Sequence, residues 1–281
     1  MNLHSLQSTG RTRPDTAAFH ERAVLRVVAA MRDRLDEELS LDQMAEVAIM
    51  SPFHFNRTFH HVTGMPPRRF LSALRLDRAR RLLLTTEERV TDVCFDVGYN
   101  SLGTFTRRFT EMLGISPRAL RGCATSSVAS VVQSLPEARP PLLAEGGEVS
   151  GTVAVPDDFR GLVFVGLFGA ALPQGAPVAC RIMAGSGPFS LDAPAGQWHL
   201  YALGIRQPAA PLKLLLFDDA LRASGGVVDL PAVAERDPVC LALRPPSELD
   251  PPILVALPVL LARRQLRMRR STYVESAEAV V

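Results

Sequence analysis

From residue 19 to about residue 120, apolar side chains recur every three or four residues, which is the period of amphipathic helices. This pattern predicts a leading helix over residues 19–39 and a shorter apolar face over residues 41–48. Ser51 and Ser101 each stand where a side-chain oxygen can cap the start of a new helix. The pattern therefore predicts two helix-turn-helix units between residues 42 and 118, joined by a long spacer helix.

Beyond residue 150 the apolar positions fall into short runs rich in Val, Leu, Phe, Tyr and Trp, separated by Gly, Pro or Asp. Runs of this kind are typical of strands in a small all-β sandwich. The expected strands are 151–155, 162–168, 178–183, 189–192, 198–203, 212–217, 226–230 and 239–243. Residues 218–223 are expected to add a helical turn, while residues 253–262 fit either element poorly because Pro258 interrupts them.

The composition between the two patterns changes to Ala, Ser, Pro and Gly, which is typical of a linker. We therefore expect a multidomain α plus β chain, with an all-α tandem helix-turn-helix domain followed by a small all-β sandwich. The expected bounds are 19–122 for the helical domain, 123–149 for the linker, 150–262 for the sandwich and 263–281 for a basic, exposed tail.

Charge separates the two halves more clearly than the net value of +2 suggests. Residues 1–122 carry 18 Arg against 14 acidic residues, a balance of +4, and residues 123–281 carry 13 basic against 15 acidic residues, a balance of −2. The basic half holds the tandem motif, which favours a polyanionic partner. A solvated charged surface is the alternative explanation.

Four cysteines lack the close pairing of a zinc site or a redox motif, and they are Cys94, Cys123, Cys180 and Cys240. We expect them to be reduced and mainly buried, and we expect no metal or other cofactor. The neighbouring His60 and His61 have no acidic or Cys partner nearby, so a solvated pair is favoured over a metal site. The N-terminal stretch lacks the apolar core of a signal peptide, and no apolar run reaches the roughly twenty residues of a membrane helix. A cytoplasmic protein without membrane contact is therefore expected.

The helix beginning at Ser51 carries side chains suited to reading bases. Arg matches guanine O6 and N7, Asn matches adenine N6 and N7, and an aromatic group can contact the thymine methyl. The candidate DNA-binding residues of this helix are Phe53, His54, Asn56 and Arg57. For His54, an exposed histidine without a DNA contact is the alternative.

The helix beginning at Ser101 offers hydroxyl groups and charge instead. Its candidate DNA-binding residues are Ser101, Thr104, Thr106, Arg107 and Arg108. Ser and Thr discriminate poorly between bases, so we expect this helix to depend more on phosphates, which position a protein without specifying sequence. Leu102 and Gly103 stand where polar side chains would be useful for reading bases.

Three segments together resemble the DNA-binding domain of the AraC/XylS family of transcription regulators. They are S-P-F-H-F-N-R-T-F from Ser51, R-L-D-R-A-R-R-L-L in the spacer, and D-V-G-Y-N-S-L-G-T-F-T-R-R-F-T-E-M-L-G-I-S-P-R-A-L-R from Asp96. The resemblance covers about a third of the chain, over residues 20–122. It implies seven helices whose two recognition helices enter adjacent major-groove segments, held one helical turn of DNA apart by the spacer helix.

The resemblance also implies which residues face DNA: Phe53, His54, Asn56 and Arg57 in the first helix, and Leu102, Gly103, Thr104, Thr106 and Arg107 in the second. The family usually places this domain at the C-terminus, whereas here it comes first, so the signal-input mechanism of better-known members is not transferred. The later part of the chain more weakly resembles a transthyretin-like or carboxypeptidase-regulatory sandwich, through the segments G-P-F-S-L and P-A-G-Q-W-H-L-Y-A.

We therefore expect a bacterial, sequence-specific transcription regulator, of the activator type, that is not an enzyme. Its expected partner is double-stranded DNA, and RNA polymerase, a small-molecule or protein effector at the β domain, and a second copy of the chain are further candidates. Trp198, His199 and Tyr201 are weighed as a ligand pocket, although strand alternation puts one side of this trio in the core. Two rival readings are a nonspecific architectural DNA-binding protein and a DNA-repair methyltransferase fusion. The second rival is disfavoured because no Cys lies in a Pro-Cys-His-Arg context.

Overall fold

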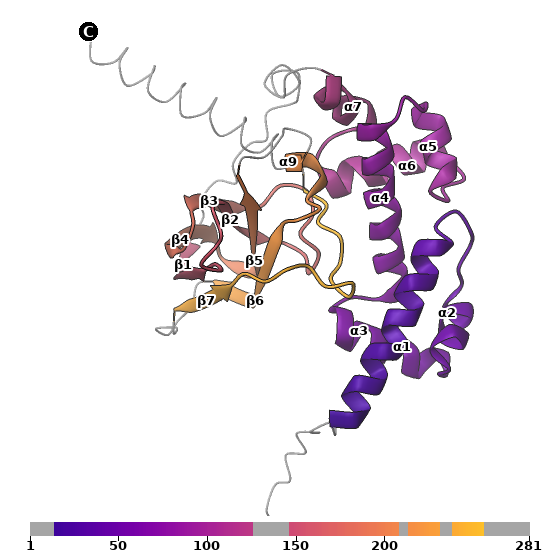
Figure 1. Ribbon diagram of the computed structural model, residues 1–281, viewed down its shortest axis with the longest axis horizontal. Helices are drawn as coiled ribbons and strands as arrows, with labels where there is room; N and C mark the ends of the chain where they lie inside the picture. The colour runs from indigo at the N-terminus through magenta and orange to yellow at the C-terminus, as the bar shows by residue number, and fades with distance from the viewer. Residues whose placement is uncertain (1–13, 126–145, 208–212, 231–237, 256–281) are drawn as a thin grey trace, which may run out of the picture.

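The computed structural model describes residues 14–125, 146–207, 213–230 and 238–255, which form a helical region beside a pair of sheets (Figure 1). The helical region holds α1 (Pro14–Asp33), α2 (Leu41–Ala48), α3 (Pro52–Thr63), α4 (Pro67–Thr85), α5 (Val90–Asp96), α6 (Leu102–Leu113) and α7 (Pro117–Thr125). In Figure 1, α4 runs between α1–α3 at one end and α5–α7 at the other. Two helix-turn-helix units are therefore joined by one spacer helix, as the sequence predicts.

Serine side chains cap the helices that the sequence marks as recognition helices. The Ser51 Oγ accepts a hydrogen bond from the His54 backbone N–H at 3.4 Å, and the Ser101 Oγ accepts one from Thr104 N–H at 3.4 Å. Both predicted caps are confirmed. A capping box at Ser40, closed by the Gln43 side chain, starts α2 and was not part of the sequence prediction.

The leading helix differs in extent from its prediction over residues 19–39. It begins at Pro14 and ends at Asp33, and residues 34–40 form a bend before α2. Leu39 is nevertheless buried, because this segment folds back onto the helical core. The helical spacing of Leu39 therefore correctly indicates that it is buried, although the residue does not lie in a helix.

The sheet region contains seven strands among the described residues: β1 (Gly146–Ala154), β2 (Gly161–Phe168), β3 (Ala179–Ala184), β4 (Gly187–Pro194), β5 (Gly196–Arg206), β6 (Leu221–Leu230) and β7 (Val239–Ala242). One sheet has the order β4-β1-β7 and the other β3-β2-β5-β6. All pairings are antiparallel except β1 with β7. Alternate residues of both sheets fill a single buried cluster, for example Val153 of β1, Val165 of β2 and Leu241 of β7. This arrangement is a two-layer sandwich, and the predicted fold class is confirmed.

Two predictions in the sheet region are wrong. The predicted strand over residues 212–217 is wrong in its described part, because Lys213–Leu216 form the short helix α9. Leu215 and Leu216 pack against the helical core, so tertiary contacts decide the conformation of an apolar run that periodicity alone leaves undecided. Residues 218–223 do not add a helical turn either, since a turn at Asp218-Asp219 leads directly into β6 at Leu221.

The apolar core of the helices continues into the sheet region. Leu172, Leu215, Leu216 and Leu254 belong to the same buried cluster as the helical side chains. The Gly175 N–H also donates to the carbonyl of Met112, the penultimate residue of α6, at 2.6 Å. The two regions therefore share a packed boundary. Within the described residues, no helix is long and apolar enough to span a membrane.

Candidate nucleic-acid interface

Equivalent phenylalanines orient the two recognition helices. Phe55 and Phe59 of α3, and Phe105 and Phe109 of α6, have no exposed surface. Within each helix the two ring centroids lie 5.5 Å apart. Because the pairs stand at the same distance from their capping serines, the remaining positions of α3 and α6 correspond with an offset of fifty residues. All four rings therefore belong to the helical core.

The outward side of α3 carries every candidate that the sequence assigned to it. Phe53 is 82% exposed, which is unusual for a large aromatic side chain, and His54, Asn56 and Arg57 are also exposed. Asn56 and Arg57 are consecutive, so they leave the helix in neighbouring directions, about 100° apart. The first turns of α3 thus present an amide, a guanidinium and an aromatic ring to solvent.

His54 also contacts the leading helix. Its ring lies 5.5 Å from that of His20 on α1, in an edge-on arrangement. Burial, followed by the positive charges of His54 and His61, lowers the pKa of His20. His60 and His61 are both exposed, as expected for a solvated pair. The α3 unit therefore has histidines near its outward side, and the α6 unit, over residues 90–125, contains none.

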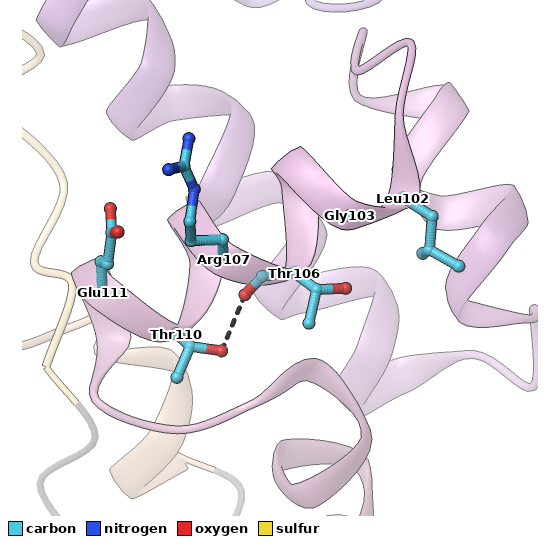
Figure 2. A pocket seen from close by; sticks show the side chains of 6 residues that line it. All are labelled: Leu102, Gly103, Thr106, Arg107, Thr110 and Glu111. Carbon is cyan, nitrogen blue, oxygen red and sulfur yellow. Dashed lines mark hydrogen bonds between the residues drawn. The ribbon is translucent and has the colours of Figure 1, made fainter.

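The outward side of α6 forms a shallow groove of different chemistry (Figure 2). It is lined by Leu102, Gly103, Thr106, Arg107, Thr110 and Glu111. The Thr110 hydroxyl donates to the Thr106 carbonyl at 2.7 Å, so it is engaged within the helix. Arg107 and Glu111 lie along one edge of the groove in Figure 2, and Leu102 lies at the helix start. Arg107 is the one cationic side chain among these lining residues.

The other α6 candidates lie beside the groove. Thr104 and Arg108 are exposed, and Ser101 is occupied by its capping hydrogen bond. Arg108 forms an ion pair with Glu111 at 3.7 Å. Since both side chains are exposed, this pair is weak and can open toward a phosphate. The structure thus brings the α6 candidates to one surface but leaves Arg107 and Arg108 as its only charged DNA-contact candidates.

Position for position, the two helices differ at the places that matter for reading bases. Asn56 corresponds to Thr106 and Phe53 to Gly103, whereas Arg57 corresponds to Arg107. A Cβ added at Gly103 would meet only the Ser101 Oγ, at 3.8 Å, so packing does not require a glycine there. Gly103 therefore affects the surface that α6 presents to solvent, and the packing of α6 against the core does not depend on it.

Arg75 of the spacer helix α4 ties the two helix-turn-helix units together. Arg75 donates to the Gly98 carbonyl in the turn of the α6 unit at 3.1 Å and to the Glu37 carbonyl before α2 at 2.6 Å. A single side chain therefore joins the turn of one unit to the entry of the other. An Arg among many in a spacer gives no sequence signal for this role, because its acceptors are backbone carbonyls far along the chain.

Trp198, His199 and Tyr201, which the sequence suggests as a ligand pocket, do not all lie on the same face of the sheet. Trp198 packs against the sandwich core, whereas Tyr201 packs against an apolar cluster on the outer face of the four-stranded sheet. Burial and the charge of Arg69 on α4 lower the pKa of His199. The expected alternation is confirmed, and Tyr201 alone of the trio lines a cavity on this outer face.

The cysteines only partly follow their prediction. Cys94 and Cys123 are buried, and burial raises the pKa of each thiol. Cys180 is half-buried on β3, whereas Cys240 is exposed because it points outward from β7 beside the inward Leu241. Cys180 packs on the outer face of the four-stranded sheet and Cys240 points outward from the other sheet, so the two thiols do not face each other. In the described part of the chain, no three His, Cys, Asp or Glu side chains converge on a metal-sized site.

Comparisons with known proteins place the helical region in a family. Residues 44–122 match the family described as "Helix-turn-helix domain". The transcriptional activator RhaS of Enterobacter sp. (strain 638) is 35% identical over 95 residues, covering 34% of this chain and 34% of that protein. The uncharacterized transcriptional regulator YobQ of Bacillus subtilis (strain 168) is 33% identical over 94 residues, covering 34% of this chain and 39% of that protein. The chain thus spans little more than a third of the length of these curated relatives.

Solved structures give partial matches to the same region. One is the DNA-binding domain of AdpA in complex with a target DNA, 33% identical, with a TM-score of 0.35, covering 36% of this chain and 91% of that one. Another is an AraC-type transcriptional regulator from Chromobacterium violaceum, 26% identical, with a TM-score of 0.37, covering 39% of this chain and 98% of that one. With the sequence matches, the two capped recognition helices identify the N-terminal region of this chain as a helix-turn-helix domain of the AraC/XylS type.

Proposed function

We propose that the protein is a sequence-specific DNA-binding transcription regulator whose α3 and α6 enter adjacent major-groove segments. The observation that carries this proposal is the exposure of Phe53, Asn56, Arg57 and Arg107 on helices whose buried phenylalanines fix their orientation. These side chains remain exposed while the sheet region is packed against the helices. The relatives matched are named as transcriptional regulators, which supports a non-enzymatic role.

The proposed division of labour follows from the side chains. Asn56 and Arg57 can each form two parallel hydrogen bonds to a purine edge, and this geometry supplies most of the discrimination in direct readout. Thr106 has only one hydroxyl, and Arg107 and Arg108 can bind phosphates equally well on any sequence. In this proposal α3 selects the sequence, and α6 adds affinity and fixes orientation.

The proposal assigns the helices up to Thr125 to DNA binding and the sheet region from Gly146 to a separate function. The predicted linker 123–149 therefore shortens to residues 126–145 at most, and those residues, like the predicted basic tail 263–281, lie outside the described residues. The β region would supply contacts to an effector, a partner protein or a second copy of the chain. Its docking against α4 and α6 supports this assignment, because any change in the sheets acts on elements that hold the recognition helices.

Competition binding tests the proposal. Labelled DNA fragments enriched by the protein from a random double-stranded library are bound to the full chain and challenged with unlabelled copies of the same fragments or with random DNA. We expect the enriched DNA to displace the label at concentrations at least a hundredfold lower than random DNA, since specific binding commonly exceeds nonspecific binding by about 10³ or more.

The second candidate function is nonspecific, architectural DNA binding, and Leu102 and Gly103 are the observation that favours it. An exposed leucine and a glycine at the start of α6 offer no hydrogen-bonding group to a base edge. If random DNA competes as well as enriched DNA, the regulator proposal fails and this alternative takes its place.

A further inference from the structure

The β region contains a largely apolar cavity that the DNA-binding function does not use. It lies on the outer face of the four-stranded sheet, beneath residues 250–255, and has a volume of about 80 Å³. Its apolar wall is formed mainly by Phe164, Phe168, Tyr201, Leu203, Ile253 and Val255. A water molecule occupies about 30 Å³ in the liquid, so the cavity has room for only a few atoms. Because its lining is mainly apolar, a short acyl chain of a few carbons suits it better than water.

One end of the cavity carries a partly buried cation with too few hydrogen-bond acceptors. Arg222 of β6 lines the cavity, and its guanidinium donates to the Pro251 carbonyl at 3.2 Å. Its Nε is buried and lacks a hydrogen-bond partner among the described residues. The Asp250 carboxylate lies 3.9 Å from this Nε, which is an ion-pair distance but too long for a hydrogen bond.

Asp250 is already engaged by other donors. Arg244 donates to its two oxygens at 2.6 and 2.8 Å, and the Ser247 N–H donates to it at 2.7 Å. These contacts outweigh burial and lower the pKa of the Asp250 carboxyl, which is therefore ionised at neutral pH. One carboxylate thus faces two guanidinium groups, which leaves the polar end of the cavity with an excess positive charge.

We propose that this cavity binds a small monocarboxylate, with its short apolar chain against Phe164 and Leu203 and its carboxylate hydrogen-bonded to Arg222. A carboxylate would supply the acceptor that Nε lacks, and it would balance a partly buried charge that is costly to leave underpaired. A neutral ligand of the same shape would fill the apolar end without satisfying Arg222. The site itself is independent of DNA binding, and only its regulatory role rests on the proposed function.

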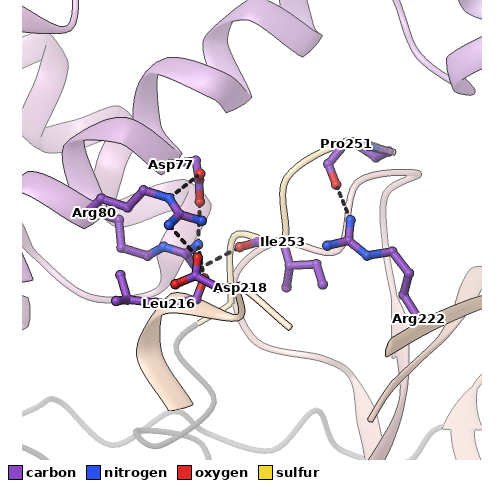
Figure 3. A network of polar contacts seen from close by, with 8 residues as sticks. Asp77, Arg80, Leu216, Asp218, Arg222, Pro251 and Ile253 are labelled. Atoms are coloured by element: carbon purple, nitrogen blue, oxygen red, sulfur yellow. Dashed lines mark hydrogen bonds and ion pairs between the residues drawn. The ribbon is translucent and has the colours of Figure 1, made fainter. Parts of the chain in front are cut away.

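The same segment that covers the cavity is held from the other side by the spacer helix (Figure 3). Arg80 of α4 is 3% exposed and donates to the Ile253 carbonyl at 2.9 Å and to the Leu216 carbonyl at 3.0 Å. Arg222 holds Pro251 in this segment, two residues from the Arg80 acceptor. Residues 251–253 therefore lie between the cavity and α4.

The Arg80 contacts make this boundary sensitive to movement of the segment. Its guanidinium also pairs with Asp77 on α4 and lies 5.1 Å from the centre of the Phe217 ring. Arg81 pairs with Asp218 across the boundary. A ligand that shifts Ile253 moves the backbone carbonyl that accepts a hydrogen bond from the buried Arg80. Because Arg80 belongs to α4, the shift is transmitted to the helix that joins the two recognition units. The ligand would then change DNA affinity.

Calorimetric titration of the full chain with butyrate tests the site, with butyramide as the neutral ligand of nearly equal shape. We expect saturable binding of butyrate and at least tenfold weaker binding of butyramide. Arg222→Gln should weaken butyrate binding at least tenfold. Ser224→Phe adds a ring at the cavity wall and should block the cavity, at the cost of the hydrogen bond that the exposed Ser224 Oγ accepts from the Gly226 N–H at 3.3 Å. Circular dichroism and melting curves establish that each variant is folded.

The outcomes separate the site from the function. No butyrate binding, equal binding of butyramide, or full binding by folded Ser224→Phe overturns the site. If Arg222→Gln does not fold, the butyramide comparison and Ser224→Phe still decide it. DNA affinity is then measured with and without saturating butyrate: a change of threefold or more supports the coupling, and an unchanged affinity overturns it. Loss of sequence preference in DNA binding with butyrate binding intact would contradict the proposed function alone.

Discussion

The α3 unit and the α6 unit place equivalent phenylalanines and capping serines at the same positions, yet they turn different side chains outward. Asn56 and Phe53 on α3 correspond to Thr106 and Gly103 on α6, and the arginine is shared. Burial fixes the first set of positions, because Phe55, Phe59, Phe105 and Phe109 fill the core. The outward positions are free of that constraint, so one framework can carry a helix that reads bases and another that binds the backbone.

The turns of the two units also differ. Ile49 and Gly98 both adopt a left-handed backbone conformation, with φ of 59° and 78°. Ile49 is 80% exposed, whereas a Cβ at Gly98 would lie 2.5 Å from the Leu35 carbonyl oxygen and 2.9 Å from the Arg75 guanidinium. Glycine is therefore required in the turn of the α6 unit, and the turn of the α3 unit tolerates a side chain.

The largest effect is expected for Gly98→Ala. The substitution combines an unfavourable left-handed backbone with a clash against a carbonyl, and we expect a loss of about 3 kcal/mol in the free energy of unfolding. Urea unfolding followed by circular dichroism measures it. The matched control Ile49→Ala should change stability by less than about 0.5 kcal/mol. Equal losses in the two variants would show that the turns do not differ as described.

Arg57→Ala is expected to have the largest effect on DNA recognition. Removing a bidentate contact to guanine should weaken binding to enriched DNA by about 1–3 kcal/mol and relax preference at one base pair. Fluorescence anisotropy with single-base variants of the enriched site is the measurement. An equal loss on every sequence would instead assign Arg57 to a phosphate.

Arg107→Ala tests the corresponding position of the other helix. If Arg107 binds a phosphate, affinity falls by a similar factor on enriched and random DNA, and the slope of log affinity against log salt falls by about 1. Binding titrations at several salt concentrations measure this slope. A loss confined to one base pair would show that α6 also reads sequence, and the proposed division of labour would be wrong.

The Ser caps and the buried phenylalanines could be predicted from the sequence because their signals are local. Ser51 precedes a proline at the first helical position, and Phe55 and Phe59 stand one turn apart. The burial of Arg80 could not be predicted in this way, since its acceptors at Leu216 and Ile253 lie more than 130 residues away in sequence. For the same reason the strand predicted over residues 212–217 is wrong, since contacts with the helices accompany the helix α9 at residues 213–216.

In the candidate site too, features set by neighbouring residues could be predicted, and features set by contacts distant in sequence could not. The sequence correctly placed Asn56 and Arg57 on the outward side of a capped helix, because helical spacing and the phenylalanine pair settle that question. It did not reveal the ties that Arg75 makes to Glu37 and Gly98, which connect the two units through backbone carbonyls. Periodicity identifies faces of helices, whereas the relation between helices depends on contacts distant in sequence.

Gly103→Gln is expected to make the two helices more alike. No packing opposes a side chain at this position, and replacing a helical glycine should raise the free energy of unfolding by about 0.5–1 kcal/mol. The amide also gives α6 a group that can read adenine. Melting curves and a repeated enrichment from random DNA measure the two effects. Unchanged stability would indicate that residue 103 is not held in a helix.

The smallest effect is expected from pH, and within the helical region it should come from the α3 unit. The pKa of His20 is lowered in the folded chain, first by burial and then by His54 and His61, so the unfolded chain holds this proton more tightly. The free energy of unfolding should therefore fall as pH drops below about 6.5, the usual histidine value. Urea unfolding at several pH values measures this fall, and His20→Gln should reduce it. An identical pH profile for this variant would exclude His20 as a cause.

Enrichment of bound DNA from a fully random double-stranded library, followed by sequencing, tests the central claim most directly. The account predicts a motif with two segments about 10 base pairs apart, on adjacent turns of one face of the duplex. The segment read by α3 should carry strong base preference, which Arg57→Ala weakens, and the segment under α6 should carry little. Equal preference in both segments, or no enriched motif, would contradict the division between a unit that reads sequence and a unit that positions the protein.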